Sequence, residues 1–328
     1  MKIVVTGSSG YIGSVLVEAL LADPQYQVVG IDRVTPTRFE RPRFEFVRCD
    51  LSAPGAELDA PVFEGTQALV HLAAARGDWA ISKEEYWRDN VAATRGLLAS
   101  PWACSVPRWV FMSSVSVYGP ANTPLAEAAP LRPIGPYGES KLVSEQHFQS
   151  FIAAQGLRGR VIRPSAVFSP GHPANTNVYK LIETLRGFPV PLIGGGHNRK
   201  TLTYLPNLLD LIFWCLQRMG EEDVAYDVFN FVEEPVQTVL ELITALKAAG
   251  ILPARRISVP LGLAVAASYP LYALAKLTGV DLRVTPERVR KYAASTWYDA
   301  SRVRQSGFVP KVDLADALHR TAAWHLSR

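Results

Sequence analysis

Short apolar runs alternate with longer amphipathic stretches along the first half of the chain. The apolar runs lie at residues 2–6, 27–32, 44–48, 67–71, 108–113 and 158–163, with helical stretches between most of them. Continuous apolar runs of this length are typical of parallel strands that are buried on both faces. The alternation therefore predicts an α/β fold in which a doubly wound parallel sheet is covered by helices.

The regular alternation ends after residue 164, and prolines are frequent from there to residue 191. The pattern then predicts a strand near 200–204, a helix near 206–218 and a strand near 226–230, followed by helices at 236–249, 261–278, 285–294 and 312–327. We expect residues 1–167 to form the sheet domain, with 200–232 returning to it. Residues 168–199 and 233–328 are then a smaller, mostly helical portion that forms the ligand pocket.

Residues 257–275 form one uncharged apolar segment, and its length alone would allow it to cross a bilayer. Pro260, Gly262, Ser268 and Pro270 interrupt it. We interpret it as a buried helix or as an element of the ligand-binding portion. A membrane-spanning helix and a peripheral contact with a membrane surface are the less favoured alternatives.

Composition and charge exclude several classes of protein. The chain has 328 residues, of which 48% are hydrophobic and 20% are charged, as in ordinary globular proteins. The net charge of +4 is spread out and no basic run suggests nucleic acid, whereas a mild basic excess suits small anionic ligands. Three cysteines without metal-binding spacing, and a chain that opens on a strand, predict reduced thiols in a cytoplasmic protein.

A glycine-rich loop follows the first predicted strand. It reads Thr6-Gly7-Ser8-Ser9-Gly10-Tyr11-Ile12-Gly13 and runs into a helical stretch. Glycines let the backbone approach a phosphate closely, and a helix N-terminus offers free N–H groups and the positive end of its dipole. The spacing G-x-x-G-x-x-G differs from the commoner G-x-G-x-x-G, yet it favours a Rossmann-type dinucleotide site that includes Gly7, Gly10, Tyr11, Ile12 and Gly13.

An acidic residue ends the second predicted strand. Asp32 lies 19 residues after Gly13, where a carboxylate accepts both ribose hydroxyls of adenosine and repels a 2′-phosphate. This favours NAD. Arg33 follows directly, and further arginines stand at 38, 41 and 43, so NADP remains possible.

Tyr137 and Lys141 are four residues apart and therefore share one face of a predicted helix. A neighbouring ammonium favours the phenolate and lowers the pKa of a tyrosine, which is about 10 in isolation. Such a phenol can take or return the proton of a carbinol while hydride moves to a nicotinamide. Ser114, at the end of the 108–113 strand, is placed to hydrogen-bond the substrate oxygen, whereas we expect Ser113 or Ser116 to cap the strand end.

These motifs together resemble the extended short-chain dehydrogenase/reductase family, in its NAD-dependent epimerase/dehydratase group. The resemblance covers nearly the whole chain and implies that Ser114, Tyr137 and Lys141 are catalytic. It further implies cofactor contacts from Asp50, Leu51, Leu72, Ala73, Ala74, Asn90, Arg163 and Pro164. Substrate contacts are expected from Arg76, Ser116, Ser165 and Arg199. A homodimer formed through the helices near 83–99 and 137–154 is implied as well.

Departures from the family pattern narrow the expected activity. Val115 and Ser116 stand where sugar 4,6-dehydratases have Asp-Glu, so water elimination is not expected. Ala166 and Ser169 replace an asparagine and a glycine of UDP-galactose-type epimerases, which indicates altered nucleotide recognition. The segment 71–98 resembles bacterial surface-polysaccharide epimerases and reductases. No H-E-x-x-H or C-x-x-C motif occurs, so we expect no metal.

Three functions stay open at this point. The first is a 4-epimerase or 4-ketoreductase that acts on a nucleotide sugar or a polyprenyl-diphosphate sugar. The second is a hydroxysteroid-like dehydrogenase or ketoreductase that acts on an apolar alcohol, which the apolar 257–275 segment suits. The third is a non-catalytic NAD(P)-binding scaffold, which is disfavoured because Ser114, Tyr137 and Lys141 are all retained.

Overall fold

The computed structural model describes most of the chain. The described residues are 1–36, 41–53, 55, 58, 61–76, 81–171, 173–174, 176–187, 190–221, 223–252, 256–278 and 285–328. Arg38, one of the arginines considered for a 2′-phosphate, lies outside them.

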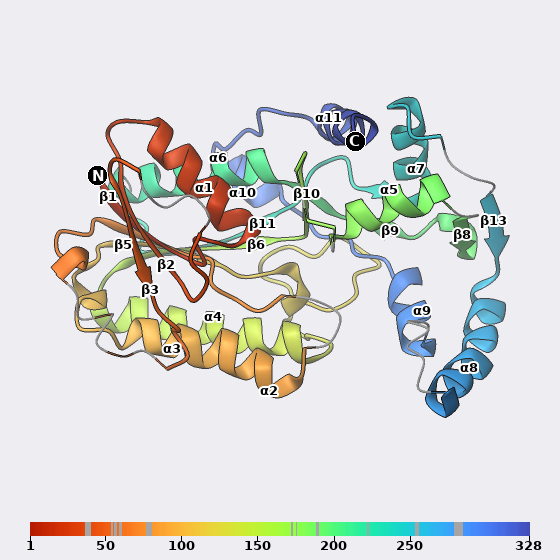
Figure 1. The fold of residues 1–328 in the computed structure, drawn as a ribbon, viewed down its shortest axis with the longest axis horizontal. Coiled ribbons are helices and arrows are strands. Elements are labelled where there is room, and N and C mark those ends of the chain that lie inside the picture. The colour runs from red at the N-terminus through yellow and green to blue at the C-terminus, as the bar shows by residue number, and fades with distance from the viewer. Residues whose placement is uncertain are drawn as a thin grey trace.

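A seven-stranded parallel sheet forms the centre of the protein (Figure 1). The strand order is β11-β6-β5-β4-β1-β2-β3, which is the Rossmann order extended by one strand. The strands are β1 (Lys2–Thr6), β2 (Gln27–Asp32), β3 (Phe44–Arg48), β4 (Ala68–His71), β5 (Arg108–Met112), β6 (Arg158–Pro164) and β11 (Tyr226–Phe231). The predicted fold class is confirmed, and β11 shows that the chain returns to the sheet after leaving it.

Helices cover both faces of this sheet because its strands bury side chains on both sides. Ile3 and Val5 of β1 belong to one hydrophobic cluster, and Val4 between them belongs to another. The first cluster packs against α1 (Tyr11–Ala22) and α6 (Leu205–Glu221). The second packs against the opposite layer, which contains α3 (Ala93–Leu98) and α4 (Pro136–Gln155). A short α2 (Lys83–Tyr86) and a π-helical turn (Trp87–Ala92) precede α3.

A third hydrophobic cluster holds the C-terminal portion together. It packs α5 (Asn177–Gly187) against α7 (Val239–Ala248) and α11 (Leu314–Leu326). The small α10 (Ser301–Gln305) lies against β11. Three short strand pairs lie outside the seven-stranded sheet: β7 (Ala166–Phe168) with β10 (Leu202–Tyr204), β9 (Arg199–Lys200) with β12 (Gln237–Thr238), and β8 (Val190–Ile193) with β13 (Arg256–Val259). Strands of two to four residues show no clear periodicity, so the sequence pattern missed most of them.

The interpretation of the apolar segment 257–275 as a buried helix is wrong. The segment forms the end of β13 and most of α8 (Leu261–Thr278), but α8 is exposed rather than buried. Leu263 and Leu277 expose 63% and 85% of their surface. The helix packs against α9 (Pro286–Ala293), and the two project from the body as a hairpin (Figure 1). Within the described part of the chain, no helix combines the length and apolarity that crossing a membrane requires.

Candidate active site

Two glycines of the glycine-rich segment that joins β1 to α1 have no room for a side chain. Gly7 has a φ of +68°, and a Cβ there would lie 2.8 Å from the backbone nitrogen of Ala73. A Cβ on Gly13 would lie only 2.1 Å from the carbonyl oxygen of Gly7. The loop therefore packs directly onto its own backbone and onto the segment that follows β4, as a close backbone cradle requires.

The N-terminus of α1 is open to an anion. Its N-cap is Gly10, which offers no side chain, and its first turn contains no acidic residue. The first N–H groups of a helix have no partners within the helix, and the dipole makes this end positive. The cradle therefore fits the diphosphate of NAD, and Gly10, Tyr11, Ile12 and Gly13 are the residues that would hold it.

Asp32 lies beside this loop at the end of β2. Its carboxylate accepts hydrogen bonds from the backbone N–H groups of Ser9, at 3.0 Å, and Val34, at 2.9 Å. These contacts fix its orientation and leave lone pairs for a ribose diol. The carboxylate is thus placed as a receptor for the adenosine ribose of NAD.

The neighbouring arginines are engaged with the protein itself. Arg33 forms an ion pair of 3.1 Å with Asp89, although half of its side chain is exposed. Arg41 pairs with Glu18, and Arg43 donates to backbone carbonyl groups, including that of Leu21 at 2.8 Å. Each guanidinium therefore has a partner other than a 2′-phosphate, which favours NAD over NADP.

The segment after β4 is held by a neutral histidine. His71 is buried, with Nδ1 2.6 Å from the Thr6 hydroxyl and Nε2 3.0 Å from the Thr94 hydroxyl. Burial, helped by the positive charge of Lys141, lowers the pKa of His71 to about 3. The imidazole is therefore neutral at any physiological pH. Thr6 also accepts from the backbone N–H groups of Leu72 and Ala73, each at 3.2 Å, which fixes that segment beside the glycine loop.

Asn90 connects the same segment to α4. Its side-chain oxygen accepts from the N–H of Ala75 at 2.7 Å, and its side-chain nitrogen donates to the Ser140 hydroxyl at 2.8 Å. Asn90 is 1% exposed. Its contacts in this structure tie the cofactor-side loop to the helix that carries Tyr137, while a direct contact with the cofactor stays a prediction.

Tyr137 and Lys141 lie one turn apart near the N-terminus of α4. Lys141 is 4% exposed, and its Nζ lies 4.9 Å from the ring centroid of Phe111 in β5. Burial lowers the pKa of Lys141 to about 8, against the opposing effect of the Glu145 carboxylate. The Tyr137 ring packs at 5.7 Å from that of Tyr86. A buried ammonium thus sits one helical turn from a phenol, as the sequence predicts for an acid/base pair.

Ser114 follows β5 and is 7% exposed. Its hydroxyl accepts from the N–H of Ser116 and donates to the Ser116 hydroxyl, each at 3.1 Å. We expected Ser113 or Ser116 to cap the strand end, but Ser114 itself caps the 3-10 turn Val115–Val117. Ser113 is used differently, because its hydroxyl donates to the Glu145 carboxylate at 2.6 Å.

A buried ion pair between Glu145 and Arg163 lies behind these residues. The Nε of Arg163 donates to Glu145 at 3.1 Å, its Nη2 forms the second bond of the pair, and its Nη1 donates to the Tyr118 hydroxyl. Arg163 is 3% exposed and Glu145 is 5% exposed. Our sequence reasoning did not identify Glu145, although the repeat of four residues from Tyr137 through Lys141 to Glu145 places it on the same helix face.

The predicted substrate residues lie in several elements of the C-terminal portion and the loops. Arg199 of β9 stacks on Trp297 at 4.4 Å from the ring centroid and donates to the carbonyl group of Val236 at 2.8 Å. The Ser165 hydroxyl lies 3.0 Å from that of Thr203, and Arg76 is exposed. Direct contacts of these residues with a substrate stay predictions.

Four further residues predicted to contact the cofactor have defined surroundings. The Tyr11 hydroxyl is 2.7 Å from that of Ser169, and burial raises the pKa of Tyr11 to about 12, so it remains a neutral phenol. The exposed Asp50 carboxylate accepts from Ser52, while Leu51 is buried. Pro164 ends β6 in a buried position.

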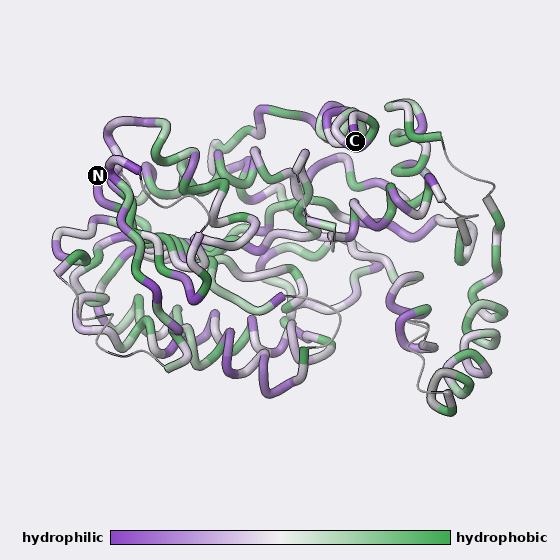
Figure 2. Tube along the Cα trace, viewed as in Figure 1, coloured by the Kyte–Doolittle hydropathy of each residue, from purple (hydrophilic) through white to green (hydrophobic). Residues whose placement is uncertain are grey.

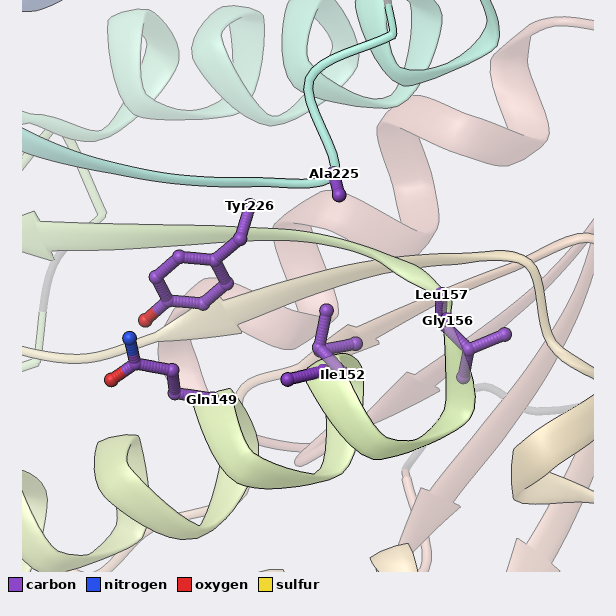
Figure 3. A pocket seen from close by; sticks show the side chains of 7 residues that line it. Gln149, Ile152, Gly156, Leu157, Ala225 and Tyr226 are labelled. Atoms are coloured by element: carbon purple, nitrogen blue, oxygen red, sulfur yellow. The ribbon is translucent and has the colours of Figure 1, made fainter.

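One apolar cavity of about 230 Å³ lies elsewhere (Figure 3). Ile152, Leu157 and Tyr226 are among its lining residues, from the C-terminal half of α4 and the starts of β6 and β11. In a parallel sheet the strand starts form the edge opposite to the carboxyl ends, where Ser114 lies. This cavity is therefore separate from the candidate active site.

The fold and the site together define an NAD-dependent enzyme of the extended short-chain dehydrogenase/reductase type. The chain belongs to the NAD dependent epimerase/dehydratase family, whose sequence profile matches residues 3–230. The predictions of family, enzymatic nature and NAD as cofactor are confirmed.

Several relatives cover nearly the whole chain, and two of them have characterised activities in their names. One is N-acetyl-alpha-D-glucosaminyl-diphospho-ditrans,octacis-undecaprenol 4-epimerase of Escherichia coli O157:H7, with 28% identity over 98% of this chain and 94% of that protein. The other is 2-alkyl-3-oxoalkanoate reductase of Stenotrophomonas maltophilia, with 28% identity over 98% of this chain and 99% of that protein. A solved structure of MoeE5 in complex with UDP-glucuronic acid and NAD matches with a TM-score of 0.76 and 25% identity, covering 100% of this chain and 99% of that chain.

Substituting alanine for Gly13 is expected to remove the cofactor site. The new Cβ would overlap the Gly7 carbonyl, so the loop must open and the cradle is lost. We expect the amount of NAD that copurifies to fall about tenfold or more. The matched control is Gly187→Ala, at the exposed end of α5, where no atom lies within 4 Å of the new Cβ. Stoichiometric NAD in Gly13→Ala would show that the loop tolerates a side chain and that the cradle is misplaced.

Proposed function

We propose that this protein is an NAD-dependent 4-epimerase of a sugar diphosphate, either a nucleotide sugar or a polyprenyl-diphosphate sugar. The observation that carries the proposal is the placement of Tyr137 one helical turn from the buried Lys141, on the helix that Asn90 ties to the cofactor-side loop. A 4-ketoreductase would use the same residues, so the fate of the cofactor separates the two.

The chain's own residues account for the proton transfer. Tyr137, as phenolate, takes the proton of the C4 hydroxyl and later returns it to the C4 oxygen. The Lys141 ammonium favours the phenolate through its positive charge. Ser114 donates a hydrogen bond to the same oxygen, for which its hydroxyl must leave Ser116. NAD, when bound, supplies the acceptor and donor of the C4 hydride.

We infer a sugar diphosphate as the substrate because Arg199 matches, by its place in the sequence, the arginine that binds the substrate diphosphate in this family. The Escherichia coli relative acts, by its name, on a diphospho-undecaprenol sugar, and MoeE5 binds UDP-glucuronic acid. Residues 1–167 with 200–232 would bind NAD, and residues 168–199 and 233–328 would contribute to the substrate site with Arg76, Ser116 and Ser165. We place the enzyme in the cytoplasm as a homodimer that serves polysaccharide biosynthesis, with a possible membrane contact.

A second candidate is a ketoreductase that acts on an apolar alcohol or ketone. The Stenotrophomonas relative, which matches 98% of the chain, favours it. The exposed apolar α8 is also compatible with an apolar ligand. Arg199 favours an anionic ligand instead.

The first test measures the cofactor and the products together. The purified protein is denatured, and released NAD is quantified by absorbance and mass. The native protein is then incubated, without added cofactor, with UDP-N-acetylglucosamine and with N-acetylglucosaminyl-diphospho-undecaprenol. Retained NAD together with a C4-inverted product supports the 4-epimerase. A requirement for added NADH or NADPH, with its stoichiometric consumption, would overturn it in favour of a reductase.

The pH dependence of turnover should report Lys141. Because burial holds the pKa of Lys141 near 8, its ammonium is present below that pH and is lost as the pH rises through it. The loss removes the charge that favours the Tyr137 phenolate, so we expect kcat/KM to fall above about pH 8. Lys141→Arg keeps its charge throughout and should lack this alkaline decline, although its absolute rate is lower. An unchanged wild-type rate up to pH 10 would contradict this role of Lys141.

A further inference from the structure

The hairpin formed by α8 and α9, which we call the apolar hairpin, exposes many large hydrophobic side chains. Figure 2 shows hydrophobic residues along α8 in this projecting segment. The hairpin contains a series of large side chains that each expose between 37% and 85% of their surface: Leu261, Leu263, Tyr269, Leu271, Tyr272, Leu274 and Leu277. Isolated apolar side chains on a surface need no explanation, but a contiguous series marks an interaction site.

The exposed side chains of α8 are not confined to one stripe. Successive residues of an α-helix are about 100° apart, so Leu271, Tyr272 and Leu277 point in three directions that are each about 100° or more apart. A protein groove covers one face of a helix, whereas a helix that is apolar all round requires a medium that surrounds it. The acyl-chain boundary of a bilayer is such a medium, and tyrosines such as Tyr269 and Tyr272 are typical of that boundary.

The charge of the hairpin segment complements an anionic surface. Residues 256–294 contain six Lys or Arg and two Asp or Glu, while the rest of the chain has 28 of each, so the segment accounts for the whole net charge of +4. In the described part of this segment, Arg290 and Lys291 are exposed. Arg290 donates to the Tyr269 hydroxyl at 3.2 Å, which places positive charge beside the apolar helix. Apolar bulk next to basic residues is the composition of helices that bind anionic lipids.

The apolar hairpin is attached directly to the strand that carries Arg199. The side chain of Asn198 donates to the carbonyl group of Tyr292 at 3.0 Å, and Lys200 donates to that of Ala294 at 2.7 Å. The backbone N–H of Arg199 itself donates to the Ser295 hydroxyl at 3.2 Å. The hairpin is therefore joined to the predicted diphosphate site by a short bonded connection.

We propose that the apolar hairpin docks on the surface of an anionic lipid bilayer and holds the active site beside it. The hairpin lies in the interface, with the apolar side chains of α8 among the upper acyl chains and the basic residues of α9 at the headgroups. A polyprenyl-diphosphate sugar then reaches Arg199 and Tyr137 while its tail stays in the membrane. This inference rests on the proposed function and selects the lipid-linked member of the two substrate classes.

The binding test is sedimentation of the full-length protein with vesicles. Vesicles of phosphatidylcholine with 30% phosphatidylglycerol are compared with vesicles of phosphatidylcholine alone. We expect binding to the anionic vesicles and about tenfold weaker partitioning for Leu263→Ser/Leu277→Ser and for Arg290→Gln/Lys291→Gln. The matched control is Val309→Ser, which changes a side chain that is 75% exposed outside the hairpin. Wild-type protein that fails to bind, or hairpin variants that bind equally well, would overturn the proposal.

Two further readouts separate the alternatives. Gel filtration of Leu263→Ser/Leu277→Ser tests whether a second copy of the chain covers the apolar hairpin instead of a membrane. Loss of a dimer together with unchanged vesicle binding would overturn the membrane assignment. Epimerisation is measured with polyprenyl-diphosphate sugar in vesicles and in detergent. We expect the hairpin variants to lose rate only with vesicles. If the wild-type protein binds vesicles but epimerises the sugar in neither medium, the proposed function is refuted and the membrane docking is not. If the hairpin variants and the wild type have equal rates in vesicles, the docking role is refuted.

Discussion

Tyr137→Phe is expected to lower kcat about a thousandfold while the protein keeps its fold and its NAD. The substitution removes only the phenolic oxygen, so the ring keeps its packing at 5.7 Å from Tyr86. Without that oxygen the C4 hydroxyl loses the base that we assign to it, so hydride transfer from C4 becomes slow. The measurement is single-turnover reduction of the bound cofactor, followed at 340 nm after sugar diphosphate is added.

Tyr86→Phe provides the matched comparison. Tyr86 is a buried phenol whose ring contacts Tyr137, so it is the alternative base within this part of the site. We expect its loss to change kcat by less than about tenfold. Equal or greater loss in Tyr86→Phe, or undiminished turnover in Tyr137→Phe, would refute the assignment of Tyr137. Thermal unfolding of both variants shows whether any loss arises from folding.

Arg163→Met is expected to destabilise the protein by about 3–5 kcal/mol. The substitution leaves the Glu145 carboxylate buried, with the Ser113 hydroxyl as its remaining bonded partner among the contacts described above. The carboxylate then loses its bonded counter-charge, and the Coulombic attraction of Lys141 alone offsets only part of the cost of desolvation. The measurement is urea unfolding at a fixed NAD concentration, because bound cofactor adds to the apparent stability.

A double variant separates the charge from the packing. Arg163→Met/Glu145→Gln removes both charges while the amide oxygen can still accept from Ser113, so we expect it to be more stable than Arg163→Met by about 2 kcal/mol. The exposed pair Arg320–Asp316, at 2.6 Å, is the matched surface comparison, and Arg320→Met should cost less than about 1 kcal/mol. A similar loss of unfolding free energy in both arginine variants would show that the buried pair stabilises the protein no more than the exposed pair does.

The same variant addresses the cofactor role predicted for Arg163. Its guanidinium bonds Glu145 and Tyr118 inside the protein. If Arg163 acts only through these bonds, NAD should still copurify with the folded fraction of Arg163→Met. Loss of NAD from folded protein would instead support a direct contact.

Local sequence signals were sufficient to predict the features that depend only on residues close to one another in the chain. Buried strands such as β1 and β2 need continuous apolar runs, and the glycine loop needs residues without Cβ at fixed spacing. The pair Tyr137 and Lys141 is set by helix geometry alone. These features could be predicted because each depends on neighbours within a few residues.

Features that depend on distant partners could not be predicted in this way. Glu145 has no signal of its own until β6 brings Arg163 beside α4, and the pKa of Lys141 depends on burial that the whole fold creates. Ser114, rather than its neighbours, turned out to cap the turn after β5, because the backbone direction there decides which hydroxyl meets the N–H of Ser116.

The apolar segment of α8 shows most clearly which properties depend on the local sequence and which depend on the whole fold. The helix and its apolar character could be predicted from the sequence, since both follow from composition and local propensity. The exposure of the helix could not be predicted, because burial depends on whether another part of the folded chain covers it. The described chain covers little of α8 beyond its contact with α9, so its hydrophobic surface remains available for interaction.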